Sequence, residues 1–264
     1  MTIGIFDSGL GGLVIAQSIK KLLPEYNYVY LGDTKRVPYG NRSHETVYEF
    51  TCEALKYLFE KENCNLVIIA CNTASARALR KVQQEFLPKF FPNKKVLGVL
   101  IPTAEVVKDY KKIGIIATKG TVGSHTFATE INKLNPRVKV FELATPLLVP
   151  LIEEGENKLA IPILEKYLKP LLAKNIDVLV LGCTHYPILK KEIRKIVGKN
   201  IKIISQDEII PKKLKEYLAR HKEIKLTKKG SIKILFTDIT PTVEDLSFKW
   251  FGRNTKISLV KIDN

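Results

Sequence analysis

The chain has 264 residues, of which 45% are hydrophobic, so it can bury the core of one large or two small domains. No apolar stretch reaches the length of a membrane span, and four cysteines in a chain this long do not form a disulfide framework. The net charge of +16 admits nucleic acid or an anionic substrate as a partner, but the lysines are spread along nearly every predicted helix. A solvated basic surface is therefore the favoured interpretation.

In the first half of the chain, strand and helix patterns alternate, which predicts an α/β fold with a mostly parallel sheet. Strands are expected over 2–6, 28–31, 65–70 and 96–100, and helices over 13–23, 43–61 and 74–86. Pro24 and Pro88 are expected to end the first and third helices, and Ile101-Pro102 to begin the crossover to the second half. The glycine-rich turn after the first strand is not a dinucleotide fingerprint, because Val14 holds the third glycine position.

The second half repeats this plan and then continues beyond it. Strands are expected over 113–117, 138–142, 177–181 and 201–204, and helices from the turn 118–121 to about 134 and over 147–154, 158–174 and 188–197. A helix over 207–221, strands over 232–236 and 257–260 and a helix near 242–250 exceed the repeat. This last region is expected to pack on the first half. The predicted domains are therefore residues 1–98 plus 207–264, which form a discontinuous domain, and residues 99–206.

Two cysteines occupy matching places in the two halves. Cys71 and Cys183 each follow a continuous apolar strand, 112 positions apart, and Ile3 and Ile113 begin similar strands 110 positions apart. The carboxyl ends of strands are where open α/β sheets bind ligands, and a helix amino terminus there can lower a cysteine pKa. If the halves face each other, the two thiols meet across one cleft, one on each face of a substrate carbon. A two-base racemase needs this arrangement.

Five motifs in this order resemble those of the glutamate racemase family. They are Asp7-Ser8-Gly9, Val37-Pro38-Tyr39-Gly40, Ala70-Cys71-Asn72-Thr73, Glu153-Glu154-Gly155 and Gly182-Cys183-Thr184-His185-Tyr186-Pro187. The resemblance spans nearly the whole chain. It implies a cofactor-independent enzyme that interconverts L- and D-glutamate and supplies D-glutamate for peptidoglycan. It also implies two α/β domains related by pseudo-twofold symmetry, with the active site between them.

The resemblance also implies roles for individual residues. Cys71 and Cys183 alternate as thiolate base and thiol acid, with Asp7 as the partner of Cys71 and His185 as that of Cys183. Glu153 is expected to orient His185, and the choice between Glu153 and the adjacent Glu154 stays open. The expected substrate-binding residues are Asp7, Ser8, Tyr39, Gly40, Asn72, Thr73, Thr118, Thr121, Thr184 and His185. Cys52 and Cys64, within a helix and at a helix end, are interpreted as packing residues.

Alternatives remain open beside this interpretation. An aspartate or related two-cysteine racemase is the closest one, and a nucleic-acid-associated protein is the alternative from another class. No zinc-finger spacing, aromatic RNA-binding signature or C-x-x-C pair is present, so no metal site and no specific nucleic acid are expected. The chain begins directly in a predicted strand, so a cytoplasmic protein without a membrane segment is expected. A homodimer of unspecified geometry is also expected.

Overall fold

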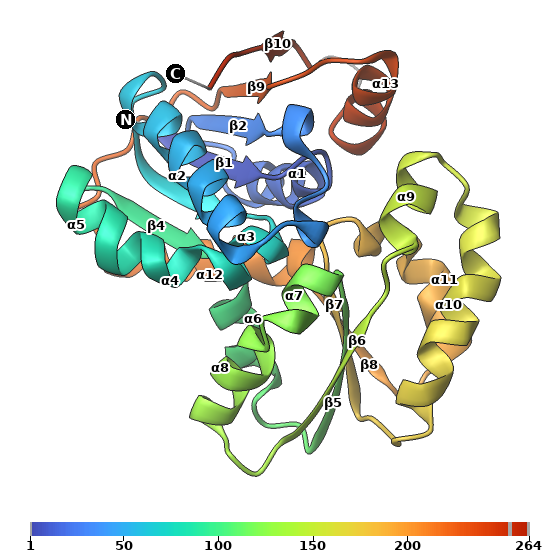
Figure 1. The fold of residues 1–264 in the computed structure, drawn as a ribbon. Coiled ribbons are helices and arrows are strands. Elements are labelled where there is room, and N and C mark those ends of the chain that lie inside the picture. Colours follow the sequence, from blue (N-terminus) through green and yellow to red (C-terminus); the bar gives the residue numbers. More distant parts are fainter. Residues whose placement is uncertain (1, 253–254, 263–264) are drawn as a thin grey trace.

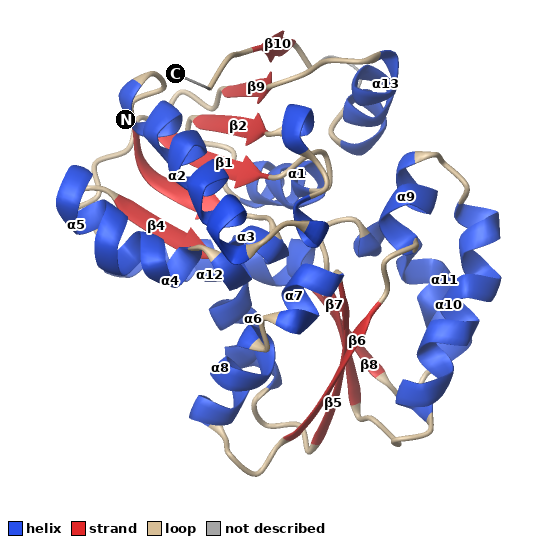
Figure 2. Cartoon of the chain, in the orientation of Figure 1, coloured by secondary structure: helices blue, strands red, loops and turns tan. Residues whose placement is uncertain are grey.

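The computed structural model describes residues 2–252 and 255–262. Its strands form two separate sheets in which every pair is parallel, and helices flank both sheets (Figures 1 and 2). The predicted α/β class, with two similar halves, is confirmed. No helix among the described residues combines the length and apolar character needed to cross a membrane.

The first sheet has six strands in the order β10-β9-β2-β1-β3-β4. These strands are β1 (Thr2–Asp7), β2 (Tyr28–Gly32), β3 (Cys64–Ile69), β4 (Lys95–Gly98), β9 (Ile232–Phe236) and β10 (Ile257–Leu259). The helices between them are α1 (Gly12–Leu22), α2 (His44–Glu60), α3 (Asn72–Arg77), α4 (Leu79–Lys81), a π-helical turn (Val82–Phe86), α5 (Leu87–Phe90) and α13 (Pro241–Trp250). Short 3-10 turns cover Thr34–Arg36 and Tyr39–Asn41.

The second sheet has four strands in the order β6-β5-β7-β8. These strands are β5 (Lys112–Ala117), β6 (Lys139–Ala144), β7 (Val178–Gly182) and β8 (Lys202–Ser205). The helices are α6 (Leu100–Val107), α7 (Lys119–Gly123), α8 (Thr126–Leu134), α9 (Leu148–Glu153), α10 (Asn157–Leu172), a 3-10 turn (Tyr186–Leu189) and α11 (Lys190–Val197). The next helix, α12 (Gln206–Arg220), follows β8 and packs on α1 of the first half. The order β6-β5-β7-β8 repeats β2-β1-β3-β4, so Cys71 and Cys183 follow equivalent strands, β3 and β7.

The core explains why the strands read as unbroken apolar runs. Successive side chains of β1 enter different apolar clusters, with Ile3 and Ile5 on one face and Phe6 on the other. A strand covered on both faces needs apolar residues at every position. The cluster that holds Ile3 also contains Leu100 of α6 and Ile209 of α12, and it continues into the second sheet. The two crossover helices therefore join the halves through a continuous core (Figure 1).

Several predicted boundaries near prolines are wrong. Pro102 is the third residue of α6, so the chain is helical where a strand end and a crossover loop were predicted. Pro88 is the second residue of α5, and the helix continues to Phe90. A proline in the first turn costs little, because its missing N–H has no partner within the helix anyway. Pro162 was expected in the first turn of the helix over 158–174, but it lies in the interior of α10.

The remaining differences concern short segments. Cys64 is the first residue of β3 and not the end of the preceding helix. The helix predicted to run to Leu134 is divided into α7 and α8, because His125 between them has a left-handed backbone with φ of 52°.

Candidate active site

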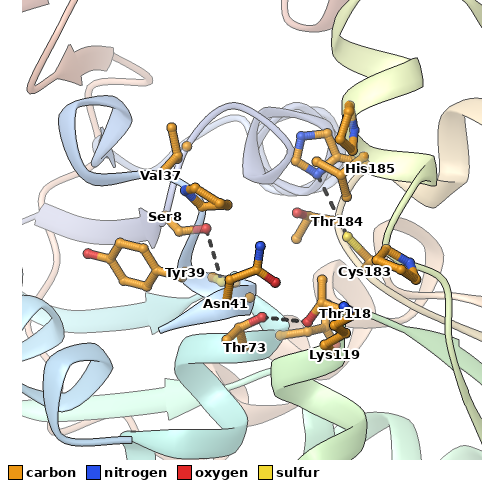
Figure 3. Close-up of a pocket in the computed structure, with 18 of the residues that line it drawn as sticks. Ser8, Val37, Tyr39, Asn41, Thr73, Thr118, Lys119, Cys183, Thr184 and His185 are labelled. Carbon is orange, nitrogen blue, oxygen red and sulfur yellow. Dashed lines mark hydrogen bonds between the residues drawn. The ribbon is translucent and has the colours of Figure 1, made fainter. Parts of the chain in front are cut away.

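A cavity of about 340 Å³ opens where the carboxyl ends of both sheets meet (Figure 3). Its wall includes most of the predicted site residues, which follow β1, β2, β3, β5 and β7 or end α9: Ser8, Tyr39, Gly40, Cys71, Asn72, Thr73, Thr118, Glu153, Cys183, Thr184 and His185. Asp7 and Thr121 are fully buried and lie outside the cavity wall. The structure thus brings both cysteines to one cavity, each from the end of an equivalent strand.

Cys71 is a buried thiol at the start of a helix. It caps α3, and its Sγ accepts a 3.5 Å hydrogen bond from the Ala74 N–H. Ser8 Oγ lies 3.2 Å from Cys71 Sγ. Burial, reinforced by the negative charge of Asp7, raises the pKa of Cys71 to about 12. The helix terminus therefore does not bring the pKa of Cys71 below its ordinary value, because loss of hydration outweighs the N–H and hydroxyl contacts.

Asp7 ends β1 and is fully buried. Its Oδ2 accepts a 2.9 Å hydrogen bond from the Gly9 N–H, whereas its buried Oδ1 has no hydrogen-bond partner within the protein. Burial raises the pKa of Asp7, and the positive charge of His185 opposes this effect. The direct polar neighbour of Cys71 is thus Ser8, and Asp7 acts on the thiol through its charge.

Cys183 has a different set of neighbours. Its Sγ lies 3.7 Å from Nδ1 of His185 (Figure 3). Nε2 of His185 lies 2.9 Å from Oε1 of Glu153. Burial alone would lower the pKa of His185, but its contacts with Cys183 and Glu153 raise that pKa to about 10. The imidazole is therefore protonated at neutral pH, and both of its N–H groups are donors. Of the two adjacent glutamates, it is Glu153 that contacts the histidine.

Trp250 and Gly11 both lie close to the imidazole of His185. The ring of Trp250, at the end of α13, meets the imidazole edge to face with centroids 5.6 Å apart. A Cβ at Gly11 would lie only 2.5 Å from His185 Nδ1, so only glycine fits there. Trp250 is far from His185 in the chain and belongs to no local motif, so no sequence signal pointed to it.

Hydroxyl groups from the two halves meet at another part of the wall. Thr73 Oγ1 lies 2.8 Å from Thr118 Oγ1 (Figure 3). It also lies 3.3 Å from Oγ1 of Thr121. Thr118 caps α7 by accepting a hydrogen bond from the Thr121 N–H. Hydroxyls and N–H groups at helix starts suit a carboxylate. Lys119 on α7 is the one lysine or arginine among the residues that line this cavity.

The hydroxyl of Tyr39 is bonded within the protein. The ring of Tyr39 lines the cavity, but its hydroxyl donates to Oδ2 of the fully buried Asp33. The Tyr39 hydroxyl points away from Cys183 (Figure 3). Thr237, at the end of β9, donates a 2.8 Å hydrogen bond to Asp33 Oδ1. Asp33 therefore ties the loop that carries Tyr39 to the first sheet.

Part of the cavity wall was not predicted to belong to the site. The additional lining residues are Gly9, Val37, Pro38, Asn41, Lys119, Thr145, Pro146, Val149, Pro150 and Glu154. Most of them adjoin a predicted motif, but Thr145 to Pro150 follow β6, whose end was not connected with the site. Among the described residues, no three His, Cys, Asp or Glu side chains gather as metal ligands.

The chain is similar to known racemases in both sequence and fold. The family model described as Asp/Glu/Hydantoin racemase matches residues 14–207. Glutamate racemase of Aquifex pyrophilus is 39% identical over 99% of this chain and 98% of its own, and that of Roseobacter denitrificans is 35% identical over 98% and 99%. The solved glutamate racemase of Francisella tularensis, in complex with D-glutamate, superposes with a TM-score of 0.91 at 33% identity, covering 99% and 98% of the chains.

The chain therefore belongs to the Asp/Glu/Hydantoin racemase family of isomerases. Its two parallel sheets repeat one strand order, and a cysteine follows each of two equivalent strands. Within that family the chain belongs to the glutamate racemases. An aspartate racemase of Picrophilus torridus shares the fold, with a TM-score of 0.59 at 21% identity.

Proposed function

We propose that this enzyme interconverts L- and D-glutamate without a cofactor, with Cys71 and Cys183 as the two bases. The observation that carries the proposal is that these buried thiols, from equivalent strands of the two halves, line one cavity. Racemisation requires that a Cα proton leave one face and that another arrive on the opposite face. Two thiols on opposite sides of the substrate supply both steps.

In the direction from D- to L-glutamate, the Cys71 thiolate removes the Cα proton and becomes a thiol. The electron pair stays on the substrate, delocalised into the α-carboxylate, and the Cys183 thiol protonates the opposite face and becomes a thiolate. The reverse reaction exchanges the two roles. At rest the raised pKa of Cys71 keeps it protonated. The ammonium group of a bound amino acid brings a positive charge that favours the thiolate.

The neighbours of each thiol support the assignment of partners. His185, held by Glu153, presents a protonated imidazole to Cys183 and can pass a proton to or from that sulfur. On the other side, Ser8 contacts Cys71 and the carboxyl of Asp7 lies behind it. Asp7, with its raised pKa and its unpartnered Oδ1, is suited to exchange a proton on the Cys71 side of the cavity.

The polar wall supports a dicarboxylic amino acid as the substrate. The hydroxyls of Thr73 and Thr118, the start of α3 and the cation of Lys119 provide groups that bind carboxylates. The similarity to the glutamate racemases named above supports glutamate rather than aspartate as this substrate. We further propose that the D-glutamate produced serves peptidoglycan synthesis.

The setting of the enzyme follows from the same proposal. All four cysteines are free thiols, as expected in the reducing cytoplasm.

We propose domains of 1–98 plus 207–264 and of 99–206, because β9 and β10 extend the first sheet while β5 to β8 form the second. Residues 1, 253–254 and 263–264 of the first range lie outside the described residues. A homodimer without specific affinity for nucleic acid stays a prediction, to be checked by light scattering and by a salt titration of DNA binding.

The decisive experiment follows the circular dichroism of purified enzyme, dialysed against a chelator, with L-glutamate, D-glutamate and L-aspartate in turn. Loss of optical activity with both glutamate isomers, at the same final state, supports the proposal. Preference for aspartate would favour the related racemase instead. Activity that dialysis removes and that pyridoxal phosphate or a metal ion restores would contradict the cofactor-independent mechanism.

A further inference from the structure

Gln206 forms a paired amide contact with a residue of the cavity wall. It is the first residue of α12 and is only 1% exposed. Asn72 Nδ2 donates to Gln206 Oε1 and Gln206 Nε2 donates to Asn72 Oδ1, both at 2.7 Å. Each amide thus satisfies the other, and a residue of the second half of the chain holds the residue next to Cys71.

The remaining contacts of Gln206 fix the orientation of this pair. Gln206 Nε2 also lies 3.5 Å from the Val99 carbonyl oxygen and 3.4 Å from Thr103 Oγ1. Thr103 donates its own hydroxyl hydrogen to the Val99 carbonyl at 2.7 Å, so it can only accept from Gln206. Two acceptors on one side require the nitrogen of Gln206 to face them, which leaves its oxygen for Asn72 Nδ2.

This orientation determines what Asn72 offers to the cavity. Its Oδ1 accepts from Gln206 and one of its two Nδ2 hydrogens is donated to Gln206, so the other hydrogen is left for a further acceptor. Asn72 lines the cavity and is the first residue of α3, beside Cys71. A flipped Asn72 would place its oxygen where this hydrogen is and would repel a carboxylate.

We propose that Gln206 is a positioning residue, which keeps Asn72 turned as a hydrogen-bond donor to a carboxylate of the bound amino acid. The inference rests on the proposed function, because it assigns Asn72 to substrate carboxylate binding. Val99 and Thr103 lie where the chain enters α6, and Gln206 lies where it enters α12. Both connections between the halves therefore contribute to the orientation of Asn72.

The test compares Gln206→Met with the matched control Thr103→Val. The Met side chain keeps the volume but cannot form either hydrogen bond with Asn72, so KM for both glutamate isomers is expected to rise about tenfold with kcat nearly unchanged. Thr103→Val removes one of the two acceptors but keeps the Val99 carbonyl, which still requires the nitrogen of Gln206 to face it, so the pair with Asn72 is kept. It should lower the thermal stability without raising KM.

A double-mutant cycle separates positioning from a general structural role. If Gln206 acts through Asn72, adding Gln206→Met to Asn72→Ala should not raise KM further. Additive effects, or an equal rise of KM in Thr103→Val, would overturn the inference.

The side-chain amide of Asn72 provides a readout that needs no turnover. In nuclear magnetic resonance spectra without substrate, its paired hydrogen should exchange slowly in the wild type and rapidly in Gln206→Met. Unchanged exchange overturns the pairing, whereas a wild type that fails to racemise glutamate overturns the proposed function and the carboxylate role with it.

Discussion

Cys71 and Cys183 occupy equivalent places, but their neighbours make them chemically different. Asp7 ends β1, and the equivalent strand β5 ends in Ala117, which has no ionisable group. The second half supplies His185 and Glu153 in its place, from the turn after β7 and the end of α9. The duplicated fold therefore gives two similar thiol positions with an acidic neighbour on one side and a basic neighbour on the other.

The first prediction at this scale is that each cysteine serves one isomer. Serine is far less acidic than cysteine, so Cys71→Ser and Cys183→Ser should each abolish racemisation. Each variant still keeps one thiol that can remove a proton. With a glutamate that carries a leaving group at Cβ, proton removal expels this group, and no proton needs to be returned to the opposite face. Cys71→Ser should therefore eliminate from the L isomer alone, and Cys183→Ser from the D isomer alone.

The measurement is release of the leaving group from each pure isomer by each variant. Cys52→Ser is the matched control, because Cys52 lies on α2 outside the cavity wall and should leave racemisation intact. Elimination from both isomers at equal rates by one variant would show that a single cysteine reaches both faces.

A second prediction concerns the proton on His185. Its pKa is about 10 in the folded protein, against an ordinary value of 6.5, so folding is favoured by protonation. This stabilisation is fully present below pH 6.5 and is lost as the pH rises through about 10. His185→Asn should therefore lower the free energy of unfolding most at pH 6.5, with a difference from the wild type that shrinks towards pH 10. Urea unfolding across this range measures the difference, with His44→Asn on the exposed start of α2 as the control. A constant difference would refute the raised pKa.

At the scale of elements, the sequence predicted strands better than helix ends. Apolar runs such as 178–182 indicate buried strands directly, because both faces of each sheet are covered. Helix ends near proline were mispredicted because Pro88 and Pro102 lie in first turns, where the pattern of the chain does not distinguish a start from a stop. The anchoring of the loop 33–41 was not predictable either. Its partner Thr237 follows β9, which is distant in the sequence.

The prediction for this loop is that Thr237→Val destabilises it. The substitution keeps the shape of the side chain but removes the 2.8 Å hydrogen bond to the buried Asp33. An unsatisfied buried acceptor costs about 1–3 kcal/mol, so the free energy of unfolding should fall by this amount and KM should rise, since Tyr39 shares the Asp33 anchor. Thr34→Val is the control, because the hydroxyl of Thr34 contacts the exposed backbone of Asp238 in the same region. An equally large effect of both variants in urea unfolding and kinetics would contradict the anchor role of Asp33.

At the scale of the whole molecule, duplication was visible in the sequence but the contact between the halves was not. The matched positions of Cys71 and Cys183 indicated two similar sheets with a shared site. The fit of one half against the other depends on single side chains that no pattern marks. Gly120 on α7 is one of them, because a Cβ at this position would lie 2.9 Å from the Gly40 carbonyl oxygen and 3.0 Å from Thr73 Cγ2.

The last prediction uses this close approach. Gly120→Ala should push α7 away from Gly40 and Thr73, both of which belong to the first half and line the cavity. The separation should weaken the 2.8 Å contact between Thr73 and Thr118, so KM for glutamate should rise several-fold and the melting temperature should fall. Gly123→Ala is a matched control on the same helix, because its Cβ would meet nothing closer than 3.9 Å, at Arg77. Alanine is the better helix former by about 1 kcal/mol in a helix interior, so this control should be neutral or slightly stabilising. If Gly120→Ala behaves like Gly123→Ala in both kinetics and melting, the two halves are not held at the distance that the structure shows, and the cavity does not depend on this contact.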